Sequence, residues 1–273
     1  MKIGNHEFDV KNECYIMGIL NVTPDSFSDG GKWNDRDRAL AHTKQMIGEG
    51  AAIIDIGGES TRPGHVQISI QEEIDRVVPM IRMVKENFDI PVSIDSYKGD
   101  VVEAALEAGA DLVNDIWGLK YDPKVAQLIA QHQVPCCLMH NRDNTNYRSY
   151  LEDVQADLQE CLALAEKAGI RREQIILDPG VGFGKTYEQN LQIIHHMEKI
   201  TAMGYPVLLG TSRKSVIGLT LDLPADQRVE GTLVTTVLGV EKGASFIRVH
   251  DVKENYRAMR MTQAILEGKK HVL

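Results

Sequence analysis

The chain has 273 residues, of which 43% are hydrophobic and 25% charged, as is typical of a globular protein. Its formal net charge of −9 disfavours nucleic acid and anionic membrane surfaces as partners, and no apolar run approaches the ~20 residues that span a bilayer. An anionic substrate would therefore need a local cationic pocket that runs against the overall charge.

The first twelve residues are polar and mixed in charge, unlike a signal peptide, so we expect the protein in the cytoplasm. The four cysteines, Cys14, Cys136, Cys137 and Cys161, include no C-x-x-C pair and are too sparse for a disulfide framework. We therefore predict buried, reduced thiols. The adjacent Cys136 and Cys137 should point to opposite faces of a strand.

Short apolar runs alternate with longer amphipathic stretches along the whole chain. The runs cover residues 15–20, 52–56, 92–95, 112–116, 135–139, 175–177, 207–209 and 246–249. They are almost continuously apolar, which is typical of parallel strands that are covered on both faces.

Helical patterns fill the intervals between these runs. They cover 36–49, 71–87, 99–108, 123–131, 150–168, 187–203, 224–242 and 255–267. Apolar residues recur at three- and four-residue spacing, as at Val101, Ala105 and Ala108. Several of these helices are predicted to end at a glycine: Gly50, Gly109, Gly169, Gly204 and Gly243.

Eight strand–helix units in strict alternation predict a parallel sheet closed into a single-domain (β/α)8 TIM barrel over residues 1–273. A doubly wound open sheet is the alternative for the same alternation. Two connections, 21–35 and 59–70, are long and polar, so we expect mobile, functional loops there.

Polar residues gather where the predicted strands end. In chain order they include Asn21, then Thr61 and Arg62, Asp95, Asn114, His140, Asp178, Lys214, and Arg248 with His250. Active sites of such barrels lie at the carboxyl ends of the strands. Polar strand ends aimed at one rim therefore indicate a site there.

Three short side chains that accept hydrogen bonds, Asp95, Asn114 and Asp178, lie in or beside buried runs. Each could serve only as a cap or a structural hydrogen-bonding group. A buried carboxylate is costly unless it is paired, and two parallel N–H donors, as in the amino-pyrimidinone of a pterin, would pair with it. We assign this bidentate contact to Asp178.

Cationic residues follow the last two predicted strands. Arg248 and His250 are two residues apart and so point to the same face, and Lys214 and Ser215 begin a helix. Loops after strands seven and eight are the recurrent phosphate site of these barrels, which predicts a diphosphate site. The alternatives are a salt bridge inside the barrel for Arg248 and a solvated helix start for Lys214.

Histidine-based metal chemistry is not indicated. The nine histidines form no H-E-x-x-H pattern; His195 and His196 are expected at a helix surface, and His140 can be structural. The segment GVGFGK at 180–185 lacks the spacing of a nucleotide-binding P-loop.

Seven segments resemble the signatures of the dihydropteroate synthase family, in family order from the first strand to the last. They are GILNVTPDSFSDGG at 18–31, DIGGESTRPG at 55–64, SIDSYK at 93–98, NDIWGL at 114–119, DPGVGFGK at 178–185, GTSRKS at 210–215 and RVHDV at 248–252. The one departure is Ser96, where threonine is commoner, and it keeps the hydroxyl.

The resemblance implies an enzyme that joins (7,8-dihydropterin-6-yl)methyl diphosphate to 4-aminobenzoate in folate biosynthesis, giving 7,8-dihydropteroate and diphosphate. The implied pterin-binding residues are Asp95, Asn114, Ile116, Met139, Asp178, Phe183 and Lys214, and the implied diphosphate contacts are Asn21, Thr61, Arg248 and His250. The implied 4-aminobenzoate pocket comprises Phe27, Thr61, Arg62, Pro63 and Ser215, and Asn21 is also the implied Mg²⁺ ligand. Catalysis would rest on Asn21, Asp95, Asp178, Lys214, Arg248 and His250. The family further implies a homodimer and a sulfonamide target.

For that reaction the conjugated dihydropterin can delocalise positive charge, so we expect an SN1-like substitution in which the protein stabilises the departing diphosphate and excludes water. Three interpretations compete. A methyltetrahydrofolate-dependent methyltransferase would not need the cationic group, and a Schiff-base aldolase would use Lys214 as its amine. A binding module without turnover would lack some of the pterin or anion groups.

Overall fold

Eight parallel strands form the centre of the computed structural model, which describes residues 1–22, 31–60 and 66–268. The strands are β3 (Tyr15–Asn21), β4 (Ala51–Gly57), β5 (Val92–Asp95), β6 (Leu112–Asp115), β7 (Cys136–Met139), β8 (Ile175–Asp178), β9 (Leu208–Leu209) and β10 (Phe246–Val249). They pair in the order β8-β7-β6-β5-β4-β3-β10-β9, and a parallel bridge between Leu177 and Val207 joins the two edges. The predicted (β/α)8 barrel is therefore confirmed, and the open sheet is wrong.

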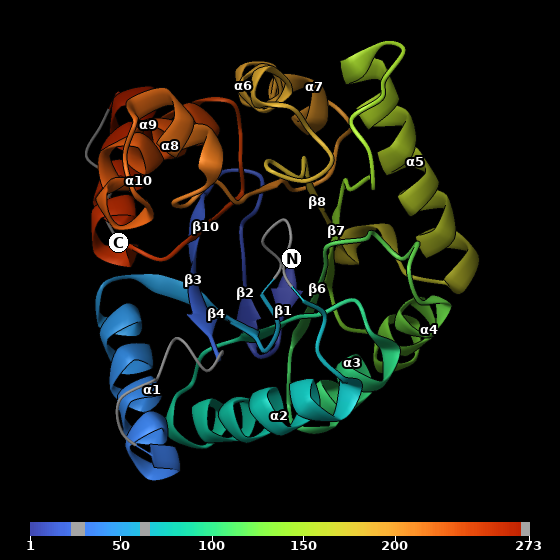
Figure 1. Ribbon diagram of the computed structural model, residues 1–273, viewed down its shortest axis with the longest axis vertical. Helices are drawn as coiled ribbons and strands as arrows, with labels where there is room; N and C mark the ends of the chain where they lie inside the picture. The colour runs from blue at the N-terminus through green and yellow to red at the C-terminus, as the bar shows by residue number, and fades with distance from the viewer. Residues whose placement is uncertain (23–30, 61–65, 269–273) are drawn as a thin grey trace.

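Helices surround the strands (Figure 1). They are α1 (Gly31–Gly48), α2 (Ile70–Asn87), α3 (Gly99–Glu107), α4 (Pro123–His132), α5 (Tyr150–Ala168), α6 (Tyr187–His195), α7 (Glu198–Thr201), α8 (Ser215–Leu221), α9 (Val229–Glu241) and α10 (Val252–Glu267), with 3₁₀ turns at Arg172–Gln174 and Ala225–Gln227. The glycines predicted to end helices have positive φ; Gly169, for example, caps α5 at φ 86°. No helix within the described ranges is long and apolar enough to cross a membrane.

Two helix predictions are wrong in their bounds. The pattern at 187–203 is interrupted at His196, where the backbone leaves the helical range at φ −106° and ψ 28°, and helix resumes with the short α7 after Met197. The pattern at 224–242 begins late, at Val229, because Pro224 starts a 3₁₀ turn instead. In addition α1 begins at Gly31, inside the predicted loop 21–35.

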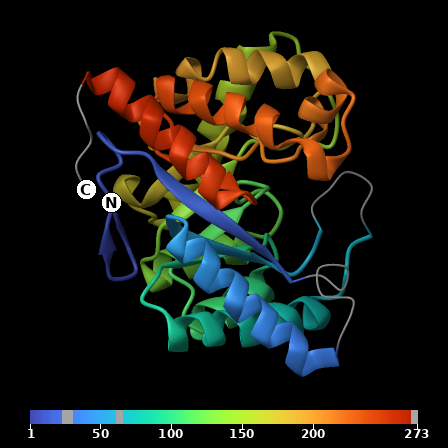
Figure 2. The ribbon, with the colours of Figure 1, turned by 90° about the vertical axis from the view of Figure 1, so that its left-hand side faces the viewer.

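A short hairpin that the patterns did not predict closes the amino end of the barrel. Strands β1 (Lys2–Ile3) and β2 (His6–Glu7) pair antiparallel, and Figure 2 shows them at the left edge. Ile3 and Phe8 pack on a buried layer formed by Met17, Ile53, Leu112, Cys137, Ile176, Leu208 and Phe246. The interior is thus apolar at this end, which leaves the carboxyl end for polar groups.

The cysteine prediction is confirmed. All four thiols are free and buried. Cys137 belongs to the inner layer of the barrel, whereas Cys136 belongs to the cluster between strands and helices, so the neighbours do point to opposite faces.

Candidate functional site

Arg248 projects from β10 into the centre of the carboxyl end of the barrel. Its Nε lies 2.6 Å from Asp55 Oδ2, and its Nη2 lies 2.6 Å from Asp95 Oδ2. The interior salt bridge is therefore present, with two carboxylates around one guanidinium. Asp55, on β4 and fully buried, was not among the predicted site residues, although a carboxylate in the run AAIIDIG was a signal.

The charged groups in this cluster shift one another's pKa values. Burial raises the pKa of Asp95, Arg248 opposes that rise, and Asp55 adds to it. Burial acts to lower the pKa of Arg248, but Asp55 and Asp95 outweigh it and raise that pKa, so the guanidinium remains charged. Asp55 Oδ1 and Asp95 Oδ1 are buried without a hydrogen-bond partner in the described part of the chain. Orphaned acceptors of this kind suit a ligand that carries N–H donors.

Asp178 ends β8 and lies beside the same cluster. Its Oδ1 accepts the Gly180 N–H at 2.7 Å. A Cβ built on Gly210, which follows β9, would lie 3.8 Å from Asp178 Oδ2 and 3.9 Å from Arg248 Cβ. The predicted pterin carboxylate, Asp178, and the predicted diphosphate cation, Arg248, therefore lie close together at the carboxyl end of the barrel. We call this end of the barrel, around Asp178 and Arg248, the mouth. Burial raises the pKa of Asp178, and Lys214 opposes that rise.

Lys214 points into the mouth. Its Nζ donates to the carbonyl oxygen of Val181 and lies 4.8 Å from the centroid of the Phe183 ring. Burial lowers the pKa of Lys214 to about 8, although Asp178 acts in the opposite direction. Lys214 precedes the first residue of α8, but its partly buried side chain reaches back to Val181 and Phe183. Its neighbour Arg213 turns away and pairs with Asp251.

An apolar wall lines the mouth next to these charges. Ile116 and Met139 form a buried cluster with Tyr97, against which Trp117 and Phe183 pack. Met139 is paired in register with Asp178, which places this wall beside the carboxylate. Asn114, also predicted for the site, is buried on β6 and donates to Asp55 Oδ2 over 3.4 Å. The structure thus brings the whole predicted pterin set together.

His250 and Asn21 lie at neighbouring strand ends. Ser212 Oγ accepts the backbone N–H of His250 at 3.1 Å and lies 2.9 Å from its Nδ1, so Ser212, which was not predicted, orients the imidazole. Asn21 ends β3, between β4 and β10. The other histidines expected at the surface are there: His195 is exposed and His196 is half-buried.

Much of the predicted arylamine pocket lies outside the described residues, namely Phe27, Thr61, Arg62 and Pro63. The described flanks of the second loop are held by one carboxylate. Glu59 accepts from Lys98 Nζ at 2.8 Å, from Tyr97 OH at 2.7 Å and from the Ile68 N–H at 2.8 Å. Glu59 thereby fixes the chain on both sides of residues 61–65.

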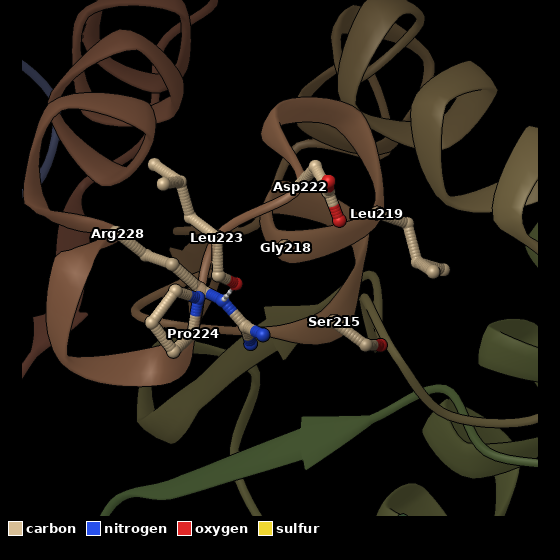
Figure 3. Close-up of a pocket in the computed structure, with 7 residues that line it drawn as sticks. All are labelled: Ser215, Gly218, Leu219, Asp222, Leu223, Pro224 and Arg228. Atoms are coloured by element: carbon tan, nitrogen blue, oxygen red, sulfur yellow. Dashed lines mark hydrogen bonds between the residues drawn. The ribbon is translucent and has the colours of Figure 1, made fainter.

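Ser215, the remaining arylamine candidate, is exposed at the start of α8. It lines an open pocket of about 480 Å³ (Figure 3) together with Gly218, Leu219, Asp222, Leu223, Pro224 and Arg228. None of the predicted pterin residues lines this pocket. It is therefore a neighbour of the mouth and not the mouth itself.

Comparison with known proteins covers nearly the whole chain. Residues 17–250 match the family described as pterin binding enzyme. The dihydropteroate synthase of Clostridium beijerinckii is 61% identical to this chain, covering 97% of it and 99% of the relative, and that of Bacillus subtilis is 52% identical, covering 94% and 90%.

Solved structures agree with these relatives. A dihydropteroate synthase from Clostridium difficile, crystallised in the presence of pteroic acid, superimposes with a TM-score of 0.93 at 51% identity, covering 95% of this chain and 99% of that one. The Yersinia pestis enzyme, in a complex with a sulfonamide drug, gives 0.92 at 40% identity, covering 98% and 99%.

Proposed function

The chain belongs to the dihydropteroate synthases, pterin-binding transferases of the folate pathway, and from that premise we propose that the mouth around Asp178 and Arg248 carries out the condensation by an SN1-like substitution. The bond between the methylene carbon and the diphosphate oxygen breaks, and its electron pair leaves with the diphosphate. The amine nitrogen of 4-aminobenzoate then forms the C–N bond and loses a proton to solvent. One observation carries the proposal: Asp178 Oδ2 and Arg248 both face Gly210, so one small ligand can reach both.

The carboxylates would hold the heterocycle. Asp178 accepts the ring N–H and the exocyclic amino group, and the orphaned Oδ1 of Asp95 accepts a further donor. Ile116, Met139 and Phe183 pack on the flat ring. The two negative charges also stabilise the cation that develops on the dihydropterin when diphosphate leaves.

The cations would hold the leaving group. Arg248 uses Nε and Nη2 for Asp55 and Asp95, while its Nη1 has no hydrogen-bond partner in the described structure and can donate to a diphosphate oxygen. Lys214 and His250 lie on the loops after β9 and β10, where barrels of this class bind phosphate.

The donor set fits Mg²⁺ brought in with the diphosphate. The described residues contain no group of three His, Cys, Asp or Glu side chains that would cage a metal. Mg²⁺ usually takes one or two protein oxygens and completes its shell with phosphate oxygens and water, so Asn21 alone would suffice. When bound, the ion would neutralise part of the diphosphate charge.

The arylamine would lie between Ser215 and the loops 21–35 and 59–70. Glu59 and Lys98 anchor the second loop, which makes a defined pocket possible once substrate is present. A sulfonamide, such as the one in the Yersinia pestis complex, would compete with 4-aminobenzoate there. The buried free thiols agree with action in a reducing compartment, and we place the enzyme in the cytoplasm.

The test of this function is a coupled assay of diphosphate release with Mg²⁺ present. We expect release only when dihydropterin methyl diphosphate and 4-aminobenzoate are both added. Release without the arylamine would instead indicate a diphosphatase. Methyl transfer from methyltetrahydrofolate would instead support the methyltransferase, and borohydride trapping of Lys214 with a carbonyl substrate would support the aldolase.

The pH dependence of kcat/KM for dihydropterin methyl diphosphate should show an alkaline limb. Protonated Lys214 is the form that attracts the anion, and burial lowers its pKa to about 8, so kcat/KM should fall as pH rises through that value. In Lys214→Met, kcat/KM should be lower at every pH, and the alkaline limb should be absent. A limb of the same pKa in the variant would show that another group titrates.

We further propose that the enzyme is a homodimer that buries the exposed face of α8–α10. This face comprises Leu219, Leu221, Val234, Val237, Met261, Ile265 and Leu266, each at least 38% exposed. Helix α9 is apolar on its solvent side as well as its core side, which is typical of a helix covered on all sides. A dimer interface would explain why so many apolar side chains are exposed on this face.

Light scattering should therefore give twice the chain mass of 30.4 kDa for the wild type and one chain mass for Val234→Asp. Val234 is 59% exposed, so the substitution costs little within one chain. Leu164→Asp, on α5 and 36% exposed, is the matched control and should remain dimeric. A monomeric wild type or a dimeric Val234→Asp would refute this interface.

A further inference from the structure

A buried polar contact lies behind the loop that joins β8 to α6. Lys185 Nζ lies 2.8 Å from the carbonyl oxygen of Gly180, 3.0 Å from that of Phe183 and 2.7 Å from Nδ1 of His140. An ammonium has three N–H donors and no acceptor, so these three partners use all of them. Lys185 thereby ties two points of its own loop to the residue that follows β7.

The imidazole of His140 is arranged to accept this bond. It is fully buried, and its Nε2 lies 2.9 Å from Asp157 Oδ2 on α5. Burial lowers the pKa of His140 to about 4, so the ring is neutral at neutral pH and its one proton serves the carboxylate at Nε2. Nδ1 is then the acceptor for Lys185. Arg142 donates to the other oxygen of Asp157 at 3.0 Å, so this carboxylate has a partner on each oxygen.

The backbone of the loop packs against the same histidine. The His140 N–H donates to the carbonyl oxygen of Asp178 at 2.9 Å. Gly180 has φ +69°, and a Cβ there would lie 1.9 Å from the carbonyl oxygen of His140. Since the Gly180 N–H also binds Asp178 Oδ1, the position of Gly180 sets the orientation of the Asp178 carboxylate.

The same loop carries the partners of Lys214. The Val181 carbonyl accepts from Lys214 Nζ, and the Phe183 ring lies beneath that ammonium. Lys185 holds the residues on either side of Val181, namely Gly180 and Phe183. Loss of the Lys185 ammonium would therefore disturb both charges that face the heterocycle.

Building on the proposed function, we propose that Lys185, held by neutral His140, is a positioning residue for pterin binding. It does not contact the ligand in the mouth, because all three N–H donors of its ammonium already bind the loop carbonyls and the histidine. It fixes the carboxylate of Asp178 and the ring of Phe183 in the geometry that receives the pterin. The lysine of the GVGFGK segment thus makes hydrogen bonds within the protein and does not contact an anion.

Three variants of the full-length enzyme test this role. Lys185→Met removes all three donors at similar volume. Lys185→Gln keeps an amide with two N–H donors and is the second variant if the first does not fold. Lys120→Met is the control, because Lys120 is exposed on the same rim and, among the described residues, its side chain donates to the Asn141 carbonyl alone. Burial lowers the pKa of Lys185 to about 7, so assays at about pH 6.5 keep its ammonium.

Two readouts separate a positioning role from a general loss of structure. The first is the Kd for the bare pterin alcohol, 6-hydroxymethyl-7,8-dihydropterin, by calorimetry. The second is the KM for the arylamine at saturating pterin substrate. We expect Lys185→Met to raise the pterin Kd roughly tenfold to a hundredfold, Lys185→Gln to raise it less, and both to change the arylamine KM by less than about twofold.

Lys120→Met should match the wild type in both readouts. An unchanged pterin Kd in Lys185→Met, or equal losses for both substrates, would overturn the proposal. Failure of wild-type diphosphate release would count against the proposed function, and the pterin Kd of the three variants, which is measured without turnover, would still decide the role of Lys185.

Discussion

Asp178→Asn should weaken binding of the bare pterin alcohol, 6-hydroxymethyl-7,8-dihydropterin, by about a hundredfold or more, because two charge-assisted hydrogen bonds are lost in a buried site. The substitution keeps the shape of the side chain. The Gly180 N–H already binds Oδ1 at 2.7 Å, and the amide oxygen of asparagine would take that place. Its NH2 group would then face the two donors of the pterin, and donors would oppose donors.

Calorimetry with the wild type, Asp178→Asn and Asp143→Asn makes the comparison. Asp143 is exposed on the loop after β7, so the same chemical change there should leave the pterin Kd unchanged. An Asp178→Asn enzyme that binds pterin as tightly as the wild type would remove Asp178 from the assignment.

Arg248→Met should have the largest effect on the enzyme as a whole, since it acts on both stability and the leaving group. Removing the guanidinium leaves Asp55 and Asp95 buried without their partner, which should lower the free energy of unfolding by about 3–5 kcal/mol at neutral pH. Urea unfolding of the variant and the wild type measures this difference.

The stability loss should shrink in acid. Without Arg248 the folded-state pKa of Asp95, already raised by burial, rises further above the ordinary aspartate value near 3.8. The folded state then binds a proton more tightly than the unfolded state, so stability is regained as pH falls below the folded pKa and lost as pH rises through it. A gap from the wild type that stays constant between about pH 5 and 8 would contradict a buried unpaired carboxylate.

The same variant separates the two halves of the substrate. Arg248→Met should weaken binding of dihydropterin methyl diphosphate by at least about tenfold more than binding of the bare pterin alcohol, because Arg248 serves the diphosphate. Equal losses for the two ligands would place Arg248 in the pterin half of the site instead.

The sequence predicted the barrel because its signals are local. Apolar runs of three to six residues with helical patterns between them have few solutions, and the structure adopts the closed one. Where helix bounds were missed, the apolar periodicity did not mark the end. The buried spacing of Ile193, Met197 and Ile200 continues across the break at His196, so the pattern 187–203 looks like one helix.

The sequence predicted those residues of the site that lie at the carboxyl ends of strands. Asp178, Lys214 and Arg248 converge as expected, because parallel strands bring their carboxyl ends to one rim. The partners of those residues could not be predicted, since they depend on long-range contacts. Asp55 meets Arg248 across 193 positions of sequence, and Lys185 meets His140 across 45.

A crystal structure with an unreactive analogue of dihydropterin methyl diphosphate tests the central claim most directly. We expect the amino-pyrimidinone edge within hydrogen-bond distance of the Asp178 carboxylate, and the diphosphate beside Arg248 and His250. A heterocycle bound in the pocket between Ser215 and Arg228, or a diphosphate that leaves Arg248 untouched, would contradict it.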